Sequence, residues 1–153
     1  MEPGTDAARY PVTIMEVETQ PLAVVRRKAA LNELGTVLMG AFDEVWAFLR
    51  ANGVSTNHNV VLYFDQVFNL EAGVQVLSPL PPSGTVYASE TPGGRVATTT
   101  HWGDYGELPL AHTAIARSII ANGLQAAGPN WEVYGDWDDD PAKVRTDVYY
   151  LLR

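Results

Sequence analysis

The segment Ala51-Asn52-Gly53-Val54 ends one helical pattern, and its near copy Ala121-Asn122-Gly123-Leu124 ends a second pattern about 70 residues later. Glycine at such a position adopts the left-handed backbone conformation of a helix C-cap without steric cost. Because two helices end in the same way and similar segments surround them, the endings indicate an internal repeat. This repeat is the feature from which the fold is predicted.

Each ending follows an apolar stripe with helical spacing. The first stripe runs from Leu34 to Leu49 and the second from Leu108 to Ile119, at steps of three and four residues. Pro109 suits the first turn of the second helix. A stripe of this kind lies on one helix face and requires a sheet to cover it. We therefore predict two amphipathic helices, each packed on strands.

Strand-like segments flank the two helices in the same order, one before each helix and two after it. The predicted strands are 22–27, 59–65, 70–77, 95–101, 130–136 and 144–151, with two further strands near 12–17 and 85–90. The pattern predicts an α+β fold of two β-α-β-β modules, at about 11–80 and 84–153. One module alone leaves apolar surface exposed, so we expect the modules to pack about a pseudo-two-fold axis, with a ligand groove between them.

Composition limits the class of protein. Of 153 residues, 46% are hydrophobic and 18% charged, as in a packed globular domain, and we expect one domain over 11–153 after a flexible tail at 1–10. The net charge of −8 disfavours direct nucleic-acid binding. Since there is no cysteine, disulfides and thiolate chemistry are excluded. No apolar run reaches the ~20 residues of a membrane span and no signal peptide is visible, so we predict a cytoplasmic protein without membrane contact.

The second half is rich in polar aromatic residues, whose flat faces and hydrogen-bonding tips suit planar ligands and cations. Trp131 and one of the pair Tyr149 and Tyr150 are expected in the core, because alternation along a strand puts these two tyrosines on opposite faces. The candidate ligand-binding aromatic residues are Tyr63, Trp102, Tyr105, Tyr134, Trp137 and Tyr149.

Glu132 lies in the middle of a predicted strand and, by the two-residue period, shares a face with Tyr134. Alternation leaves two interpretations open: a carboxylate on a solvent-facing sheet surface, or one that faces the groove. In the groove, a partly desolvated acid would favour a cationic or hydrogen-bond-donating ligand.

Metal and cofactor signatures are weak. Asp136, Asp138, Asp140 and Asp147 have the spacing of a calcium loop, but Pro141 stands where the sharp turn needs glycine, and the flanking segments are predicted strands. We predict a solvated loop with a short turn at 141–143 and no metal. His58, His101 and His112 are too scattered for a local zinc motif, and His112 is expected to be exposed or capping. No phosphate-binding, dinucleotide or serine-nucleophile motif is present, so no cofactor is expected.

The order of short motifs in the second half is similar to that of the GyrI-like family. The motifs are His101-Trp102-Gly103-Asp104-Tyr105, then a helix, then Gly128-Pro129, Trp131-Glu132-Val133-Tyr134 and Arg145-Thr146-Asp147-Val148-Tyr149. The resemblance covers roughly residues 11–153. The same fold serves as the effector-binding domain of bacterial multidrug-responsive transcription activators.

The resemblance implies an antiparallel sheet with both helices on one side and an aromatic cleft between the modules. It also implies that Glu132 is the strand-borne glutamate that meets cationic drugs, and that Tyr105 is the tyrosine of the glycine-x-tyrosine turn. Asp104 replaces the proline common in that turn. No helix-turn-helix pattern precedes the domain, so a direct role as a transcription factor is not expected.

Three functions remain open at this point. The first is a stand-alone binding protein for hydrophobic or cationic small molecules, acting as a sensor or by sequestration. The second is a hydrolase of reactive electrophiles, as in some members of the resembling family, with Glu132 as general base and Tyr134 or Tyr105 orienting water or donating a proton. The third is a modulator of gyrase or of another protein partner. We rank them in this order, so an enzyme is expected less than a binding protein.

Overall fold

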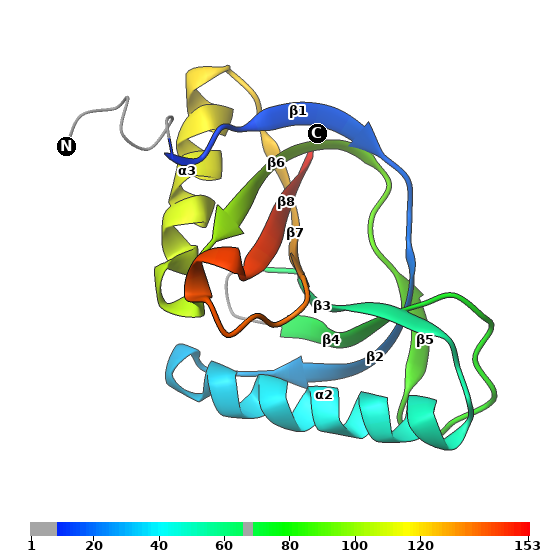
Figure 1. Ribbon diagram of the computed structural model, residues 1–153. Coiled ribbons are helices and arrows are strands. Elements are labelled where there is room, and N and C mark those ends of the chain that lie inside the picture. Colours follow the sequence, from blue (N-terminus) through cyan, green and yellow to red (C-terminus); the bar gives the residue numbers. More distant parts are fainter. Residues whose placement is uncertain (1–8, 66–68) are drawn as a thin grey trace. The chain divides into compact units, whose positions relative to one another are not determined.

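The computed structural model describes residues 9–65 and 69–153, which form two compact units (Figure 1). Unit 1 contains residues 9–18 and Gly93–Arg153, and unit 2 contains Thr19–Pro92. Most of the predicted flexible tail, residues 1–8, lies outside the described residues. Each described unit is a four-stranded antiparallel sheet with one long helix, so the predicted α+β class is confirmed.

In unit 1 the strands have the order β1-β6-β8-β7, and helix α3 connects β6 to β7. The helix packs against β6 and β8. Short 3-10 turns precede α3 and β8. The bounds are β1 Thr13–Val17, β6 Gly94–Trp102, η2 Tyr105–Glu107, α3 Leu108–Ala121, β7 Ala126–Tyr134, η3 Pro141–Lys143 and β8 Arg145–Leu152.

In unit 2 the strands have the order β3-β4-β2-β5, and helix α2 connects β2 to β3. Here α2 packs against β2 and β4. The bounds are β2 Pro21–Lys28, η1 Leu31–Glu33, α2 Leu34–Ala51, β3 Thr56–Tyr63, β4 Asn69–Val76 and β5 Tyr87–Glu90. Within each unit, the strand before the helix is thus flanked by an extra strand and by the last strand of the module.

The pairing of the two extra strands differs from the predicted division of the chain into contiguous modules at 11–80 and 84–153. Strand β1, from the N-terminal part of the chain, pairs with β6 of unit 1, for example Met15 opposite Val96. Strand β5, which follows the first module, pairs back onto β2 of unit 2, for example Ala88 opposite Ala23. The extra strand of each unit therefore comes from outside its contiguous β-α-β-β segment.

The predicted helix ends are confirmed. Gly53 and Gly123 have φ of 62° and 65°, in the left-handed region that favours glycine. The following amides fold back onto the helix: Val54 N donates to Leu49 O at 3.1 Å, and Leu124 N donates to Ile119 O at 3.0 Å. These bonds satisfy carbonyls that the last turn would otherwise leave without a partner.

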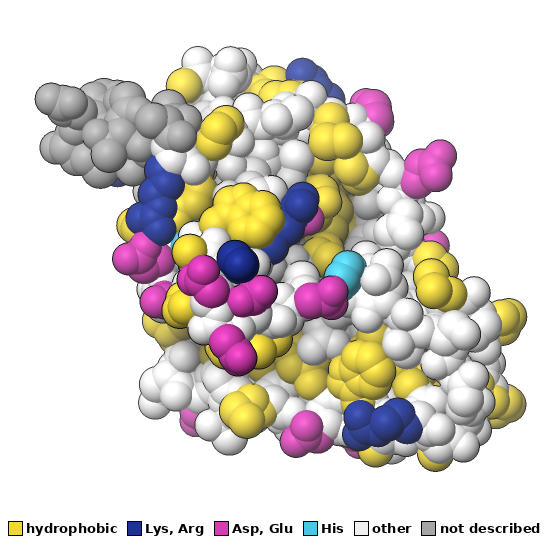
Figure 2. All heavy atoms as spheres, viewed as in Figure 1, with side chains coloured by type: hydrophobic (Ala, Val, Ile, Leu, Met, Phe, Trp, Pro, Cys, Tyr) yellow, Lys and Arg dark blue, Asp and Glu magenta, His cyan; other side chains and the backbone are white. Residues whose placement is uncertain are grey.

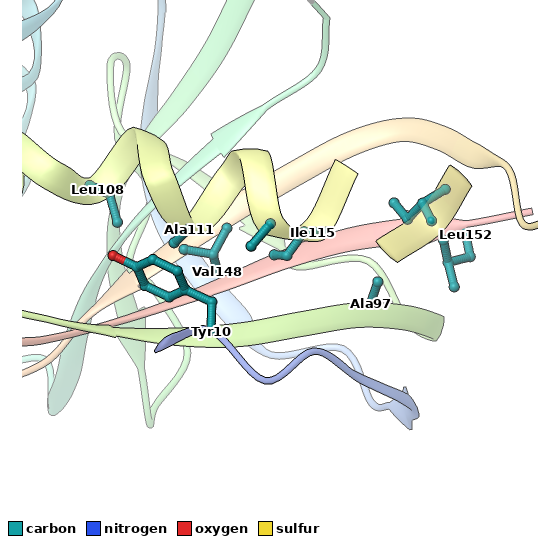
Figure 3. Packing of buried hydrophobic residues seen from close by; sticks show 9 residues of the cluster. Tyr10, Ala97, Leu108, Ala111, Ile115, Val148 and Leu152 are labelled. Carbon is teal, nitrogen blue, oxygen red and sulfur yellow. The ribbon is translucent and has the colours of Figure 1, made fainter. Parts of the chain in front are cut away.

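The core of unit 1 lies between α3 and the sheet (Figure 3). Leu108, Ala111 and Ile115 point from α3 toward the strands, and Val148 and Leu152 meet them from β8. Ala97 from β6 and Tyr10 join the same cluster. Burial of these side chains fixes which face of β6, β7 and β8 lies under α3, and hence which polar residues lie with them.

Tyr10 belongs to this core, although from the sequence it was predicted to lie in the flexible tail. It is 2% exposed, and its ring stacks on His101 at 5.8 Å between centroids. The Tyr10 hydroxyl donates to His101 Nδ1 at 2.8 Å, because His101 Nε2 already donates to the Asp104 carbonyl at 2.7 Å. A hydrophobic contact and a buried hydrogen bond therefore hold the chain at residue 10.

No helix among the described residues is long and apolar enough to cross a membrane.

Candidate functional site

Glu132 is a buried carboxylate on the α3 side of the unit 1 sheet. It is 5% exposed and lies opposite Val148 of β8, which belongs to the core of unit 1 between α3 and the sheet. Of the two interpretations left open by alternation, the solvent-facing one is therefore wrong. A buried carboxylate is expensive unless it is hydrogen-bonded or paired, so its partners determine what the site can do.

Both oxygens of Glu132 accept a hydrogen bond. The Tyr134 hydroxyl donates to Oε1 at 2.5 Å, which confirms that the two residues share a sheet face. His112, from α3, meets Oε2 through Nε2 at 2.7 Å. A hydrogen bond to a carboxylate is stronger than one between neutral groups. The bond between His112 and Glu132 therefore links helix α3 to strand β7.

His112 links Glu132 to Tyr150. Its Nδ1 lies 2.7 Å from the Tyr150 hydroxyl, and the two rings meet edge to face at 5.6 Å. Because a carboxylate only accepts, Nε2 carries a proton, and in the neutral imidazole Nδ1 then accepts from Tyr150. The result is a continuous hydrogen-bonded chain from Tyr150 through His112 and Glu132 to Tyr134, here called the Glu132 network.

His112 and Tyr150 are the members of the network that were not predicted from the sequence as site residues. His112 was expected to be exposed or capping, but its side chain is only 22% exposed and points at the sheet. The signal was in the spacing. Leu108, His112, Ile115 and Ile119 follow one another at four, three and four residues, so the histidine continues the apolar stripe of α3.

Tyr150 stays a phenol over a wide range of pH. Burial raises its pKa to about 12, and the charge of Glu132 adds to the rise. An unfolded tyrosine loses its proton near about 10. We therefore expect Tyr150 to lower the free energy of unfolding as pH rises from about 10 to about 12, because over that range the folded state still holds the proton that the unfolded state has lost.

An ultraviolet titration of phenolate absorbance tests the raised pKa of Tyr150, on which this expectation depends. The titration step near pH 12 should disappear in Tyr150→Phe and persist in Tyr87→Phe, a variant of a more exposed tyrosine in unit 2. Persistence of the step in Tyr150→Phe would show that another tyrosine is responsible.

Two further predicted residues extend the network toward the surface. Tyr105, in the turn before α3, packs edge to face on Tyr134 with centroids 5.7 Å apart. Trp137 lies in the loop after β7 and is 72% exposed, and its ring centroid is 6.5 Å from that of Tyr105. Partial burial raises the pKa of Tyr105. Tyr134, Tyr105 and Trp137 thus form a row of rings from the buried carboxylate to solvent.

The other predicted aromatic residues do not join the network. Trp102 and Tyr149 lie on the sheet face away from α3, since they alternate with His101 and with Val148 and Tyr150. There Tyr149 stacks on Trp131 at 5.3 Å, and Trp131 is buried as expected. Tyr63 belongs to unit 2, where it pairs with Leu70.

On this second face Arg145 joins Trp102 to a carboxylate. Its guanidinium lies over the Trp102 ring at 5.5 Å, and its Nε donates to Asp147 Oδ1 at 2.9 Å. Thr100 also donates to Asp147 Oδ1, at 2.8 Å. Figure 2 shows hydrophobic side chains at the surface beside acidic and basic ones, and Trp102 and Trp137 are among the exposed large side chains of unit 1.

The acidic loop after β7 uses its carboxylates to shape turns. Asp138 Oδ1 accepts from the Asp140 amide at 2.8 Å, and Asp140 Oδ1 accepts from the Ala142 amide at 3.0 Å. The predicted turn at 141–143 is the 3-10 turn η3. Within residues 9–65 and 69–153, no group of three or more histidine or acidic side chains is placed to hold a metal ion.

Comparison with known proteins gives a match to one family model. The model of the GyrI-like small-molecule-binding domain matches residues 10–153. The chain belongs to this GyrI-like family. The match spans both units and confirms the resemblance that was predicted over roughly residues 11–153. Among curated proteins, no sequence matches significantly.

Solved structures share the GyrI-like fold at low identity. The EcmrR C-terminal domain has a TM-score of 0.80 and 16% identity, covering 94% of this chain and 98% of that one. SAV2435 bound to tetraphenylphosphonium has a TM-score of 0.67 and 11% identity, covering 93% of each chain. A hydrolase from Listeria innocua has a TM-score of 0.61 and 9% identity, covering 93% and 91%. At these identities the likeness concerns the fold alone.

Proposed function

We propose that this GyrI-like domain binds hydrophobic organic cations and that Glu132 provides the charge that selects them. One observation carries the proposal: a carboxylate 5% exposed is connected to the surface by a row of aromatic rings. A buried negative charge favours a cation that can replace lost hydration, and the rings offer faces that attract cations. The ligand-bound SAV2435 structure, whose ligand is a lipophilic cation, supports the same class.

A ligand reaches Glu132 only after a covering side chain moves. Tyr134 occupies Oε1, and Tyr105 packs on the Tyr134 ring. Of the two carboxylate oxygens, Oε1 is the one whose partner, Tyr134, belongs to the row of rings that leads to solvent. The partner of Oε2, His112, is also bonded to Tyr150 on the helix side. We therefore place the ligand on the Tyr134 and Tyr105 side of Glu132, with Trp137 at the entrance. Trp102, Tyr149 and Tyr63 are not part of this proposed site.

A thermal-shift measurement with paired probes tests the proposal. Tetraphenylphosphonium and 10-methylacridinium should raise the melting temperature in a saturable manner, by mass action on the folded state. Their neutral analogues, tetraphenylmethane derivatives and acridine at high pH, should raise it much less. Equal shifts for cations and neutral analogues would contradict selection by charge. If no compound shifts the melting temperature, the binding proposal fails and a protein partner becomes the better candidate.

A second candidate function is hydrolysis of reactive electrophiles. It is favoured by the 2.5 Å contact between Tyr134 and Glu132, since a general base needs an orienting or proton-donating group within hydrogen-bond reach. Glu132 would take a proton from water as the water oxygen attacks an epoxide carbon, the ring C–O bond would break, and Tyr134 would protonate the oxygen that is released. The proton on Glu132 would then return to Tyr134 across their hydrogen bond. The test is product formation from an epoxide panel. Turnover that Glu132→Gln and Tyr134→Phe both abolish supports an enzyme, and equal product with and without protein contradicts it.

A further inference from the structure

Thr146 is a buried hydroxyl without a hydrogen-bond partner. The residue is 0% exposed. Among the buried side-chain nitrogen and oxygen atoms of the described residues, its Oγ1 is the one that has no hydrogen-bond partner. Burying a hydroxyl in this way destabilises a fold, and natural structures seldom retain one without a reason. Valine has the same shape and would avoid the penalty.

The position of Thr146 places it next to the Glu132 network. In β8 it alternates with Val148, so its side chain lies on the α3 side of the sheet. Its direct cross-strand partners are Tyr134 in β7 and His101 in β6. Glu132 is the diagonal neighbour, at a separation of roughly 7 Å for side chains so placed.

The polar neighbours of Thr146 already form hydrogen bonds with other residues. His101 uses Nδ1 with Tyr10 and Nε2 with Asp104, and the Tyr134 hydroxyl donates to Glu132. Tyr134 stands in register with Thr146 and also covers Glu132 Oε1. Tyr134 is therefore a direct neighbour of both the carboxylate and the residue with the unpartnered hydroxyl.

We infer that Thr146 is a ligand-binding residue that selects cations carrying a hydrogen-bonding group. This inference rests on the proposed function and deepens it. Glu132 recognises the charge of the ligand, and the Thr146 hydroxyl oxygen accepts a hydrogen bond from an N–H or O–H group of the same ligand. The preferred ligands are then aromatic amines in their protonated form, rather than cations without N–H or O–H groups.

The test compares two planar cations of similar size. Protonated 9-aminoacridine carries N–H donors, and 10-methylacridinium carries none. Thr146→Val should weaken binding of 9-aminoacridine about 10-fold and change binding of 10-methylacridinium less than about twofold. Thr146→Ser, which keeps the hydroxyl, should retain the preference for 9-aminoacridine.

The stability of the ligand-free protein provides a second readout. Thr146→Val should raise the melting temperature by about 2–4 °C, because it removes an unsatisfied buried group. Thr99→Val is the matched control: Thr99 is also buried in unit 1, but its hydroxyl donates to the Pro11 carbonyl at 2.8 Å. This control should lower the melting temperature and leave both affinities unchanged.

Each other outcome contradicts the inference. A lower melting temperature in Thr146→Val would mean that the hydroxyl has a structural partner. Equal weakening of both cations would assign Thr146 a packing role, and unchanged affinities would assign it none. If neither cation binds the wild-type protein, the proposed function itself fails and the inference fails with it. If 10-methylacridinium binds in a Glu132-dependent manner while Thr146→Val changes nothing, only the inference fails.

Discussion

Replacing Glu132 by glutamine is expected to weaken binding of tetraphenylphosphonium by about 100-fold, the size of effect seen when one charge of a close pair in a desolvated site is removed. Glutamine has nearly the same shape and can still accept from Tyr134 or His112, so the fold should persist. The result expected from isothermal titration is a saturable signal for the wild-type protein and a signal too weak to saturate for the variant.

Glu107→Gln is the control for this variant. Glu107 is an exposed carboxylate of unit 1 that pairs with Arg9, so the substitution changes the net charge by the same amount without touching Glu132. Exposed charges are screened by salt, and the control should alter the affinity less than about twofold at physiological ionic strength. Similar losses in both variants would show that net charge attracts the cation and that Glu132 has no special part.

The second large effect concerns Gly73, in the middle of β4. A Cβ atom built there would lie 1.8 Å from the Ala23 carbonyl oxygen and 2.8 Å from the Val24 Cα. Both are backbone atoms of the paired strand β2, so no side-chain rotation relieves the overlap. We expect Gly73→Ala to lower the free energy of unfolding by about 3 kcal/mol or more, and the melting temperature by about 6–12 °C.

Gly40→Ala provides the opposite expectation. Gly40 lies within α2, and nothing approaches the position of its Cβ atom within 4 Å. Alanine favours the helix, so this variant should be more stable by up to about 1 kcal/mol. Circular dichroism melts of the two variants test the pair, and an unchanged melting temperature for Gly73→Ala would show that β2 and β4 are not held as closely as described.

Local features of the fold could be predicted from the sequence because short-range chemistry determines them. Gly53 and Gly123 marked the helix ends, and the period of two placed Glu132 and Tyr134 on one face. The partner of an edge strand is a different matter. Nothing in the composition of 13–17 or 87–90 specifies which strand pairs with it, so the exchange of β1 and β5 between contiguous halves required the three-dimensional structure.

Only part of the candidate site could be predicted, because the rest depends on contacts between segments that are distant in the sequence. Alternation separated Tyr149 from Tyr150, but it did not tell which of them faces the helix. Tyr150 is the one bonded to His112, whereas Tyr149, the predicted ligand contact, stacks on Trp131. His112 was overlooked because a histidine in a helix has many roles, and its meaning depends on which strand residue lies opposite. Thr146 could not have been singled out, since the lack of a partner is a property of three-dimensional contacts.

The most direct test of Glu132 as the ligand-selecting group is a crystal structure of the protein with a bromine-substituted acridinium cation, whose anomalous signal locates the ligand. We expect the cation on the α3 side of the unit 1 sheet, with its charge beside Glu132 and with the Tyr134 ring displaced. A cation found instead on the opposite face, against Trp102 and Tyr149, or found far from Glu132, would contradict the assignment of Glu132 as the group that selects the ligand.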